Sequence, residues 1–480
     1  MNQHQTWSSF KTKIVKSILT DNLDETRRVL QQVPEELKLL ADLVEKVQAQ
    51  TLPLPLHKHS GPRFAISSVS YTCGVGCEMC WSGFSDKTRL FENYKNLSPS
   101  EFDDWGPWAE YGDEVMLVGL GETLDSPHIF DHLNKLRNKT TYLTTSGSTL
   151  TAKKAEKLIK SDLTHLSFSF DGETTAGHGS GDIDYSNLFW KNVTQLNALK
   201  DKLKASHPIL RLQISVDLEN LNQLQAIIEK AVAHDVREVE LFYMIPSNKE
   251  LFEKSVFSNY ENSCEQIRKV LSYWLDKGLE ISIYNRKELP EKPTSCHFAD
   301  LLLIFNLDRY LPQPCCGPFK LPLETRSLTP DQYWNSFPFR YFRYLHANDG
   351  KEMVPSLCDS CWARDPNKFA NSIKESFTSN KVSENLLPVY QNASTLKNQN
   401  KFSQAVEEFQ RVINETKDSD LLGKSHFHIG EIELSQEHYE NAFSHFREAI
   451  HYQFNHQMAF CYFYLLWVIL DKNSLATNQE

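Results

Sequence analysis

Short apolar runs alternate with longer amphipathic stretches through the middle of the chain. The expected strands are residues 64–71, 115–119, 141–145, 165–170, 210–216 and 239–244. Between them lie windows such as 152–159 and 221–234, in which apolar residues recur at helical spacing. Strands that alternate with helices form right-handed β–α–β units around a parallel sheet. The pattern from about residue 63 to 284 therefore predicts an α/β fold.

Helical periodicity dominates the N-terminal part of the chain, from Trp7 to about Gln50. Asp21 or Asn22 is placed to cap a second helix, and Pro34 to begin a third. Residues 286–375 contain many Pro, Cys and aromatic residues with little periodicity, which predicts a loop-rich segment held by something other than a large core. We expect four parts, at residues 1–58, 59–285, 286–375 and 376–480.

The last part of the chain contains an internal repeat. The two copies match in residue type, each position recurring 37 residues later: Phe402, Ala405, Phe409 and Val412, then Tyr439, Ala442, Phe446 and Ala449. Gly430 lies twelve residues before Ala442, and Ala393 holds the matching place in the first copy. This resembles the tetratricopeptide pattern, whose usual period is about 34 residues. The alternative is any antiparallel pair of helical hairpins.

Composition narrows the class of protein. The chain has 480 residues, 40% hydrophobic and 24% charged, and 51 basic against 62 acidic residues give a net charge of −11. That balance argues against broad, sequence-independent nucleic-acid binding. The N-terminus lacks the apolar core of a secretory signal, and the longest apolar stretch, 458–470, is shorter than the ~20 residues needed to cross a bilayer. We expect a cytoplasmic protein, in which clustered cysteines serve as metal ligands or catalysts.

Three of the ten cysteines follow the first expected strand. Cys73, Cys77 and Cys80 have the spacing C-x3-C-x2-C. Zinc would need a fourth protein ligand, and the next cysteine is Cys264. Three thiolates on a four-iron cluster instead leave one iron open for an outside ligand.

This cysteine motif resembles that of the radical S-adenosylmethionine (SAM) superfamily. The resemblance implies that the open iron is chelated by the amino and carboxylate groups of SAM. One electron then cleaves the sulfonium and releases a 5′-deoxyadenosyl radical, which abstracts a hydrogen atom from substrate. Trp81 stands where the family has an aromatic residue that packs against the adenine.

Three further strand ends resemble the same family. Residues 119–123 end the second strand with Gly121 and Glu122, where the family binds the methionine amino group, although Thr123 replaces the usual proline. Ser146 lies in a Thr-Ser-Gly turn after the third strand that resembles the family's Thr-Asn-Gly. Ser169 and Asp171 end the fourth strand, where the family commonly has a serine and an aspartate facing the SAM carboxylate or the substrate. The expected cofactor-binding residues are Trp81, Gly121, Glu122, Ser146, Ser169 and Asp171. The resemblance implies a partial (β/α)6 barrel with its site at the carboxyl ends of the strands. The alternative is that these residues are turn glycines and a helix cap.

A second group of cysteines lies in the third part: Cys296, Cys315, Cys316, Cys358 and Cys361. Zinc is an alternative occupant because Cys358 and Cys361 form a C-x2-C knuckle. Residues 301–316 predict a hairpin ending in Pro-Cys-Cys, and the segment resembles the SPASM/twitch extension of radical SAM enzymes. The shorter twitch form implies one auxiliary [4Fe–4S] cluster, held by Cys296, Cys315, Cys358 and Cys361. Cys316 is then spare, and Tyr310 stands where the family has a hairpin glycine.

These resemblances imply an oxidative radical SAM enzyme and two main substrates. The first is a peptide or protein that is crosslinked, given a thioether or dehydrogenated, and that is engaged by the C-terminal repeat; a dimerisation role is the repeat's alternative. The second is a sugar, aminocyclitol or nucleoside, on which the protein would act as a small-molecule dehydrogenase or epimerase. A third hypothesis is a non-enzymatic iron–sulfur scaffold. The electron donor would be a flavodoxin or ferredoxin. No catalytic residue is assigned, and the apolar run 460–470 predicts a capping helix that also contacts a partner.

Overall fold

The protein is described from a computed structural model. The structure describes residues 3–30, 37–48, 60–75, 77, 79–80, 95–172, 185–283, 296–305, 312–315, 321–323, 328–347, 353–378 and 386–470.

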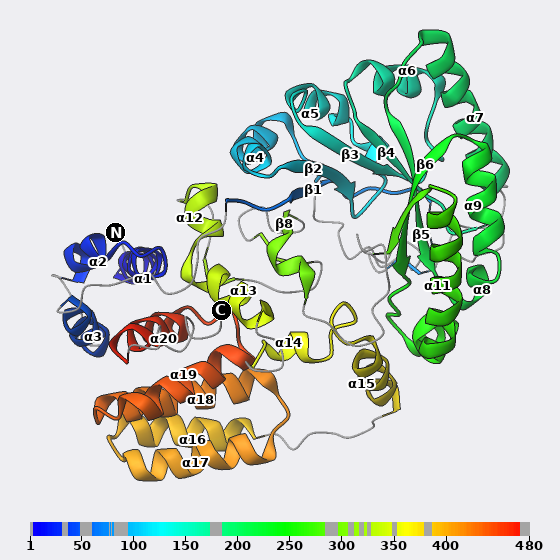
Figure 1. Ribbon diagram of the computed structural model, residues 1–480. Coiled ribbons are helices and arrows are strands. Elements are labelled where there is room, and N and C mark those ends of the chain that lie inside the picture. The colour runs from blue at the N-terminus through cyan, green and yellow to red at the C-terminus, as the bar shows by residue number, and fades with distance from the viewer. Residues whose placement is uncertain are drawn as a thin grey trace.

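The centre of the fold is one parallel sheet of eight strands in the order β7-β6-β5-β4-β3-β2-β1-β8. The strands are β1 Phe64–Ser70, β2 Glu114–Gly119, β3 Thr140–Thr145, β4 His165–Ser169, β5 Ile209–Val216, β6 Val236–Tyr243, β7 Glu280–Ile283 and β8 Leu302–Phe305. The sheet curls into an open partial barrel (Figure 1). The α/β class and all six expected strands are confirmed.

Two strands extend the sheet beyond the six expected. β7 pairs with β6, and β8 pairs in parallel with β1, from Phe64 opposite Leu302 to Ser67 opposite Phe305. Both are four residues long, which is too short for their apolar patterns to stand out in the sequence. The chain returns antiparallel after β8, where Ile304 and Gln313 exchange two backbone hydrogen bonds of 2.9 and 2.8 Å. This return agrees with the hairpin expected over residues 301–316.

Helices cover the outer face of the sheet (Figure 1). They are α4 Pro99–Tyr111, α5 Ile129–Lys135, α6 Ala152–Lys160, α7 Tyr185–Leu203, α8 Leu218–Leu221, α9 Leu224–Ala233, α10 Lys249–Lys254 and α11 Tyr260–Asp276, with 3₁₀ turns η2 Thr123–Asp125 and η3 Val256–Asn259. The outward side chains of the strands, such as Leu117, Leu166 and Leu212, are fully buried beneath them. The helix expected over 221–234 is α9, and it is preceded by the short α8, which Asp217 caps through a capping box with Asn220.

The inward face of β4, β5 and β6 carries buried polar groups, whereas that of β1, β2 and β8 is apolar. Arg211 on β5 donates to Glu240 on β6 at 2.6 Å, and both side chains are almost entirely buried. His165 on β4 lies 3.2 Å from Glu238 and stacks on Tyr142 of β3. A row of charged and aromatic groups therefore crosses the barrel interior from strand to strand.

The third part holds η4 His297–Asp300, α12 Pro330–Trp334, α13 Phe337–Ala347, α14 Ser356–Asp359 and α15 Pro366–Thr378. The expectation of a loop-rich segment without a large core is wrong for residues 328–347. Tyr333, Trp334 and Phe337 are completely buried, and α13 is enclosed on every side. The helix buries Arg340 and Arg343 together with its aromatic residues, and charged residues normally indicate an exposed surface, which is why the sequence pattern did not reveal it.

The C-terminal part is helical: α16 Leu387–Asn398, α17 Phe402–Glu415, α18 Ser419–Ser435, α19 Tyr439–Tyr452 and α20 Gln457–Ile469. The two repeat copies form two helical hairpins, α16–α17 and α18–α19. A Cβ on Gly430 would lie 2.8 Å from the Phe446 ring, so the small residue allows α18 and α19 to pack closely. The helix pairs lie where expected, and the tetratricopeptide assignment stays a prediction.

The N-terminal helices α1 Gln3–Leu19, α2 Leu23–Leu30 and α3 Lys38–Gln48 join this C-terminal stack (Figure 1). Asn22 caps α2 by accepting the Glu25 N–H at 3.1 Å. Both α1 and α3 pack against α20, whose apolar side chains are buried by α1, α3, α19 and α13. The partner surface expected on this helix is therefore an interface within the chain.

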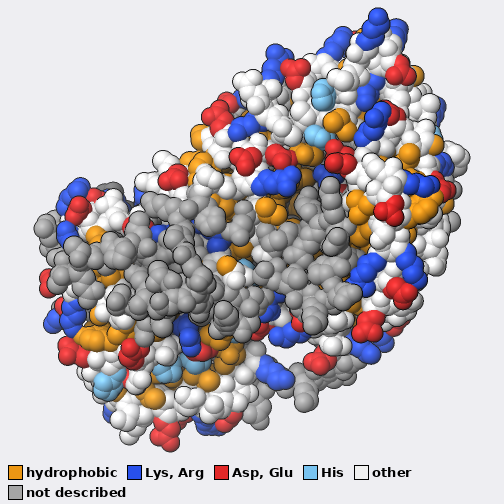
Figure 2. Space-filling view, viewed as in Figure 1, with side chains coloured by type: hydrophobic (Ala, Val, Ile, Leu, Met, Phe, Trp, Pro, Cys, Tyr) orange, Lys and Arg blue, Asp and Glu red, His pale blue; other side chains and the backbone are white. Residues whose placement is uncertain are grey.

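Acidic and basic side chains are mixed over the face shown in Figure 2. Within the described part of the chain, no helix is both long and apolar enough to span a membrane.

Candidate active site

The first cysteine loop leaves the carboxyl end of β1 and is held against the end of β2. The Gly121 N–H donates to the Ser70 carbonyl at 3.1 Å, and the Glu122 N–H donates to the Thr72 carbonyl at 2.7 Å. A Cβ on Gly121 would lie 2.2 Å from the Thr72 oxygen, so only glycine fits. Gly121 therefore allows a close backbone approach to the residue before Cys73.

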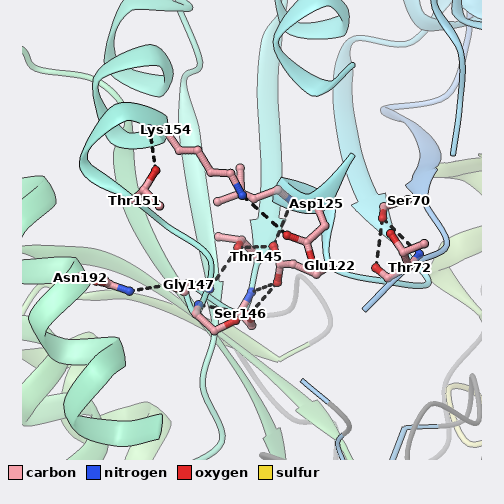
Figure 3. Close-up of polar contacts among 12 residues, drawn as sticks. Ser70, Thr72, Glu122, Asp125, Thr145, Ser146, Gly147, Thr151, Lys154 and Asn192 are labelled. Atoms are coloured by element: carbon pink, nitrogen blue, oxygen red, sulfur yellow. Dashed lines mark hydrogen bonds and ion pairs between the residues drawn. The ribbon is translucent and has the colours of Figure 1, made fainter. Parts of the chain in front are cut away.

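Glu122 is the centre of the polar contacts at this edge (Figure 3). Its Oε1 accepts from the Leu124 N–H at 3.0 Å and from the Thr145 hydroxyl at 2.5 Å. Its Oε2 accepts from the Ser146 N–H at 2.8 Å and from the Ser146 hydroxyl at 2.6 Å. The side chain is buried, and these four donors match the roughly four lone-pair directions of a carboxylate.

Glu122 and Ser146, which the sequence named separately as cofactor-binding residues, are thus bonded directly to each other. The turn after β3 needs glycine because Gly147 has a φ of +74°. Asn192 of α7 donates to the Gly147 carbonyl at 2.8 Å and fixes this turn from the outer layer.

Tyr185 joins the ends of two strands and was missed in the sequence. Its hydroxyl donates to the Ser146 carbonyl and lies 3.4 Å from the Ser169 carbonyl. Burial, followed by the charges of Cys77, Asp171 and Glu122, raises the pKa of this phenol. Tyr185 therefore lies among the expected site residues, although its only sequence signal is its position at the start of the helix after β4.

Asp171 follows β4 and is completely enclosed. Its Oδ1 accepts the Ser215 N–H at 2.6 Å, and its carbonyl accepts from the Asn220 side chain at 2.9 Å. Burial, with a smaller contribution from the Asp217 charge, raises the pKa of the Asp171 carboxyl to about 7. The residue ties the end of β4 to the end of β5 and also lies near Cys77.

The first three cysteines lie close enough to influence one another. Burial raises the pKa of the Cys77 thiol, and the charges of Asp171, Cys80 and Cys73 add to the effect. The Cys80 N–H donates to the Cys77 carbonyl at 3.1 Å, and the Val75 N–H lies 3.4 Å from the Cys73 sulfur. Trp81, the expected adenine contact, lies outside the described residues.

The second group of cysteines also gathers. Burial, followed by the charges of Cys315, Cys361 and Cys296, raises the pKa of the Cys358 thiol well above its usual value. The folded chain thus brings together the four expected ligands from three separate segments. Cys296 and Cys315 pack on Tyr142, Phe64 and their neighbours on the inner face of the barrel. Cys316 and Tyr310 lie outside the described residues.

Cys264 and Cys461 lie apart from both groups. Each is buried in a helix, as expected of an apolar thiol.

Among the described residues, no three or more His, Cys, Asp or Glu side chains converge as they would on a single metal ion. Four thiolates on a four-iron cluster each bind a different iron, so they lie farther apart than the ligands of one zinc ion. Two separated thiol groups, three at a loop and four around Cys358, fit clusters in their number and type of ligand.

No protein-family model matches this sequence, and no curated protein matches it. Solved structures do. Streptococcus suis SuiB bound to S-adenosylmethionine is 13% identical with a TM-score of 0.44, covering 76% of this chain and 90% of that chain. SuiB bound to the precursor peptide SuiA, also 13% identical, has a TM-score of 0.44 and covers 73% and 78%. Native anSMEcpe with bound AdoMet and Cp18Cys peptide has a TM-score of 0.46 at 13% identity, covering 66% and 96%.

All three TM-scores lie below 0.5. The function of this chain is therefore inferred from its own residues.

Proposed function

We propose that the protein is a radical SAM enzyme that reductively cleaves S-adenosylmethionine and oxidatively modifies a peptide or protein. The observation that carries the proposal is the joining of the cysteine loop to a buried carboxylate. Glu122 donates its backbone N–H to the residue before Cys73, while its side chain meets the Thr145–Ser146 turn. An anionic acceptor thus lies beside three thiols at the carboxyl edge of a partial barrel.

In this proposal Cys73, Cys77 and Cys80 hold a [4Fe–4S] cluster with one open iron, and Glu122 binds the ammonium group of SAM. When bound, the cluster supplies the electron for cleavage of the sulfonium. The chain's own residues orient the cofactor and exclude water from it.

Binding an ammonium at Glu122 requires one protein donor to turn away, because all four acceptor directions are used. Ser146 can do this without losing its own bond, since its hydroxyl lies 2.8 Å from the Ser148 hydroxyl. Ser169 and Asp171 are proposed to face the SAM carboxylate or the substrate.

The second thiol group is proposed to hold one auxiliary cluster as an electron relay or acceptor. Cys296, Cys315, Cys358 and Cys361 supply four thiolates, so that no iron is left open for substrate. Cys296 and Cys315 pack against the inner face of the barrel, which favours an auxiliary cluster beside the barrel interior. A zinc site remains the alternative that iron and sulfide analysis would distinguish.

A peptide substrate is favoured because the C-terminal helices pack against the segment that carries the C-x2-C knuckle of the second cysteine group. His451 on α19 lies 2.6 Å from the Val354 carbonyl, close before the C-x2-C knuckle, and α14 packs on α19. Helical repeats commonly bind peptides on a concave face. A small polar substrate, such as a sugar, aminocyclitol or nucleoside, is the second candidate because the inward face of β4, β5 and β6 carries buried polar groups.

The test of substrate class is anaerobic co-expression with short peptides encoded beside this chain's gene, followed by intact mass. Loss of the mass of two hydrogen atoms from one peptide would support oxidative crosslinking or dehydrogenation. No change in any such peptide, with turnover of a sugar or nucleoside, would reject the peptide substrate.

A further inference from the structure

A cleft of about 450 Å³ opens on the outer side of the edge that carries the candidate active site. It lies between α5 and α6. Its walls include Leu124 and Asp125 of η2, Phe130 of α5, and Lys153, Lys154 and Lys157 of α6. Apart from the Leu124 N–H, which donates to Glu122, none of these residues has a part in the proposed chemistry.

The cleft is cationic although the chain as a whole is anionic. Three lysines line it against a single aspartate, in a protein with a net charge of −11. Lys154 lies 3.6 Å from Asp125, and the Lys157 ammonium lies over the Phe130 ring at 4.8 Å from its centre. Lys153 and Lys157 are exposed, and the N-terminal end of the α6 dipole adds positive potential. The site thus favours an anionic partner.

The cleft is separated from the cysteine loop by a single turn. Figure 3 shows Lys154 reaching from α6 to Asp125, close to Glu122. The backbone of Glu122 is bonded to Thr72, the residue before Cys73. A protein docked on these lysines would therefore lie at the edge of the barrel from which the first cysteine loop leaves.

We propose that the α5–α6 cleft docks an acidic, one-electron donor protein of the flavodoxin or ferredoxin type. The inference rests on the proposed function, because reductive cleavage consumes an electron that the chain does not itself generate. One electron leaves the reduced donor, a carbon–sulfur bond of SAM breaks, and methionine and a 5′-deoxyadenosyl radical form. The donor leaves oxidised by one electron, and the lysines select it by charge.

The test compares two electron sources on the reconstituted full-length protein. The variant is K153E/K157E, which reverses both exposed lysines and leaves the Lys154–Asp125 pair in place. The matched control is K249E/K269E, which reverses two exposed lysines on α10 and α11. The readout is the rate of 5′-deoxyadenosine formation with reduced flavodoxin and, separately, with dithionite.

We expect the flavodoxin-driven rate of K153E/K157E to fall at least about tenfold at low ionic strength. Its dithionite-driven rate should equal that of the wild type, which also shows that the variant folds and binds its cofactors. The control pair should keep both rates. Added salt should slow the wild type with flavodoxin and narrow its difference from the variant.

Three results would overturn the docking proposal. The first is a wild-type flavodoxin rate in K153E/K157E, and the second is an equal loss in K249E/K269E. The third is inhibition by inorganic phosphate of both electron sources alike, which would make the cleft a small-anion site. Absence of 5′-deoxyadenosine from the wild type with dithionite would instead reject the proposed function itself.

Discussion

Glu122 is the residue at which the cysteine loop, η2 and the turn after β3 meet. Glu122→Gln keeps the shape of the side chain but removes its charge. It also brings an amide N–H₂ toward the donors on Thr145 and Ser146. We expect the dissociation constant for SAM to rise by about tenfold or more, since hydrogen bonds to charged groups contribute about 1.5–3 kcal/mol. Equilibrium binding of SAM to the reconstituted protein measures it.

Ser146→Ala is the matched control for that variant. It removes one of the four donors to Glu122 and leaves the Ser146 N–H in place. SAM binding should stay within about threefold of the wild type, because the carboxylate then has a free direction for the ammonium. Equal weakening in both variants would contradict the assignment of Glu122 as the ammonium acceptor.

The buried carboxyl of Asp171 makes stability depend on pH. Its pKa is raised from 3.8 to about 7, so the folded state disfavours the charged form. The stability associated with the protonated carboxyl is full below about pH 4 and is lost as the pH rises through about 7. Asp171→Asn cannot ionise and keeps an oxygen for the Ser215 N–H. Relative to this variant, the wild type should lose stability between about pH 4 and about pH 7.

Urea unfolding of the cluster-free protein at both pH values measures that difference. The exposed Asp201 provides the control, because Asp201→Asn should follow the wild type at each pH. A constant difference between wild type and Asp171→Asn across the range would show that Asp171 is already ionised in the fold.

The site residues that could be predicted are those whose roles depend on local sequence. Gly121 is required by a close backbone contact, and Gly147 is required by a positive φ. Both could be recognised in the sequence as glycines at strand ends. Tyr185 could not be found in this way, because its contacts depend on how α7 returns across β3 and β4. Long-range placement of one aromatic side chain leaves no periodic signal.

The strands carry a second polar feature, the buried Arg211–Glu240 pair inside the barrel. Glu240→Gln should lower the free energy of unfolding by about 3 kcal/mol. Arg211 would remain buried, and its remaining ion pair would be with the Glu238 carboxylate, 4.0 Å away. Arg237→Ala on the same strand removes an exposed ion pair with Asp235 and should change it by less than about 1 kcal/mol. Urea denaturation compares the two, and equal effects would contradict a stabilising interior row.

The helices and strands that the sequence predicted correctly are those with one apolar face and one polar face. The six longer strands and α6 were predicted to within a few residues. β8 was anticipated only as one arm of the hairpin over residues 301–316, and α13 was not predicted. α13 buries Arg340 and Arg343, whereas charged residues in a sequence normally indicate an exposed face.

At the scale of the molecule, the two ends of the chain form one helical unit beside the third part. Asp21 accepts from Arg340 of α13 at 2.6 Å and from Tyr464 of α20 at 2.8 Å. No pattern in the sequence predicts these contacts, since they join residues more than 300 positions apart. The N-terminal helices therefore serve to bury α20 and to anchor the helical unit.

Asp21→Asn tests that anchor. Asparagine tolerates the left-handed φ of 61° at this position, so the variant removes the charge without straining the backbone. Arg340, which is 1% exposed, would lose its ion pair with the Asp21 carboxylate. We expect the free energy of unfolding to fall by about 3 kcal/mol. Asp24→Asn, in an exposed pair with Arg27, should cost less than about 1 kcal/mol. Similar losses in both would show that Asp21 does not anchor the unit.

The central claim is that the first cysteine loop supports reductive cleavage of SAM. The most direct measurement is 5′-deoxyadenosine formed after anaerobic reconstitution with iron and sulfide, addition of SAM and reduction with dithionite. We predict its formation by the wild type and its absence from C73A/C77A/C80A, whose auxiliary cysteines are intact. No 5′-deoxyadenosine from the reconstituted wild type, or equal amounts from both proteins, would contradict the account.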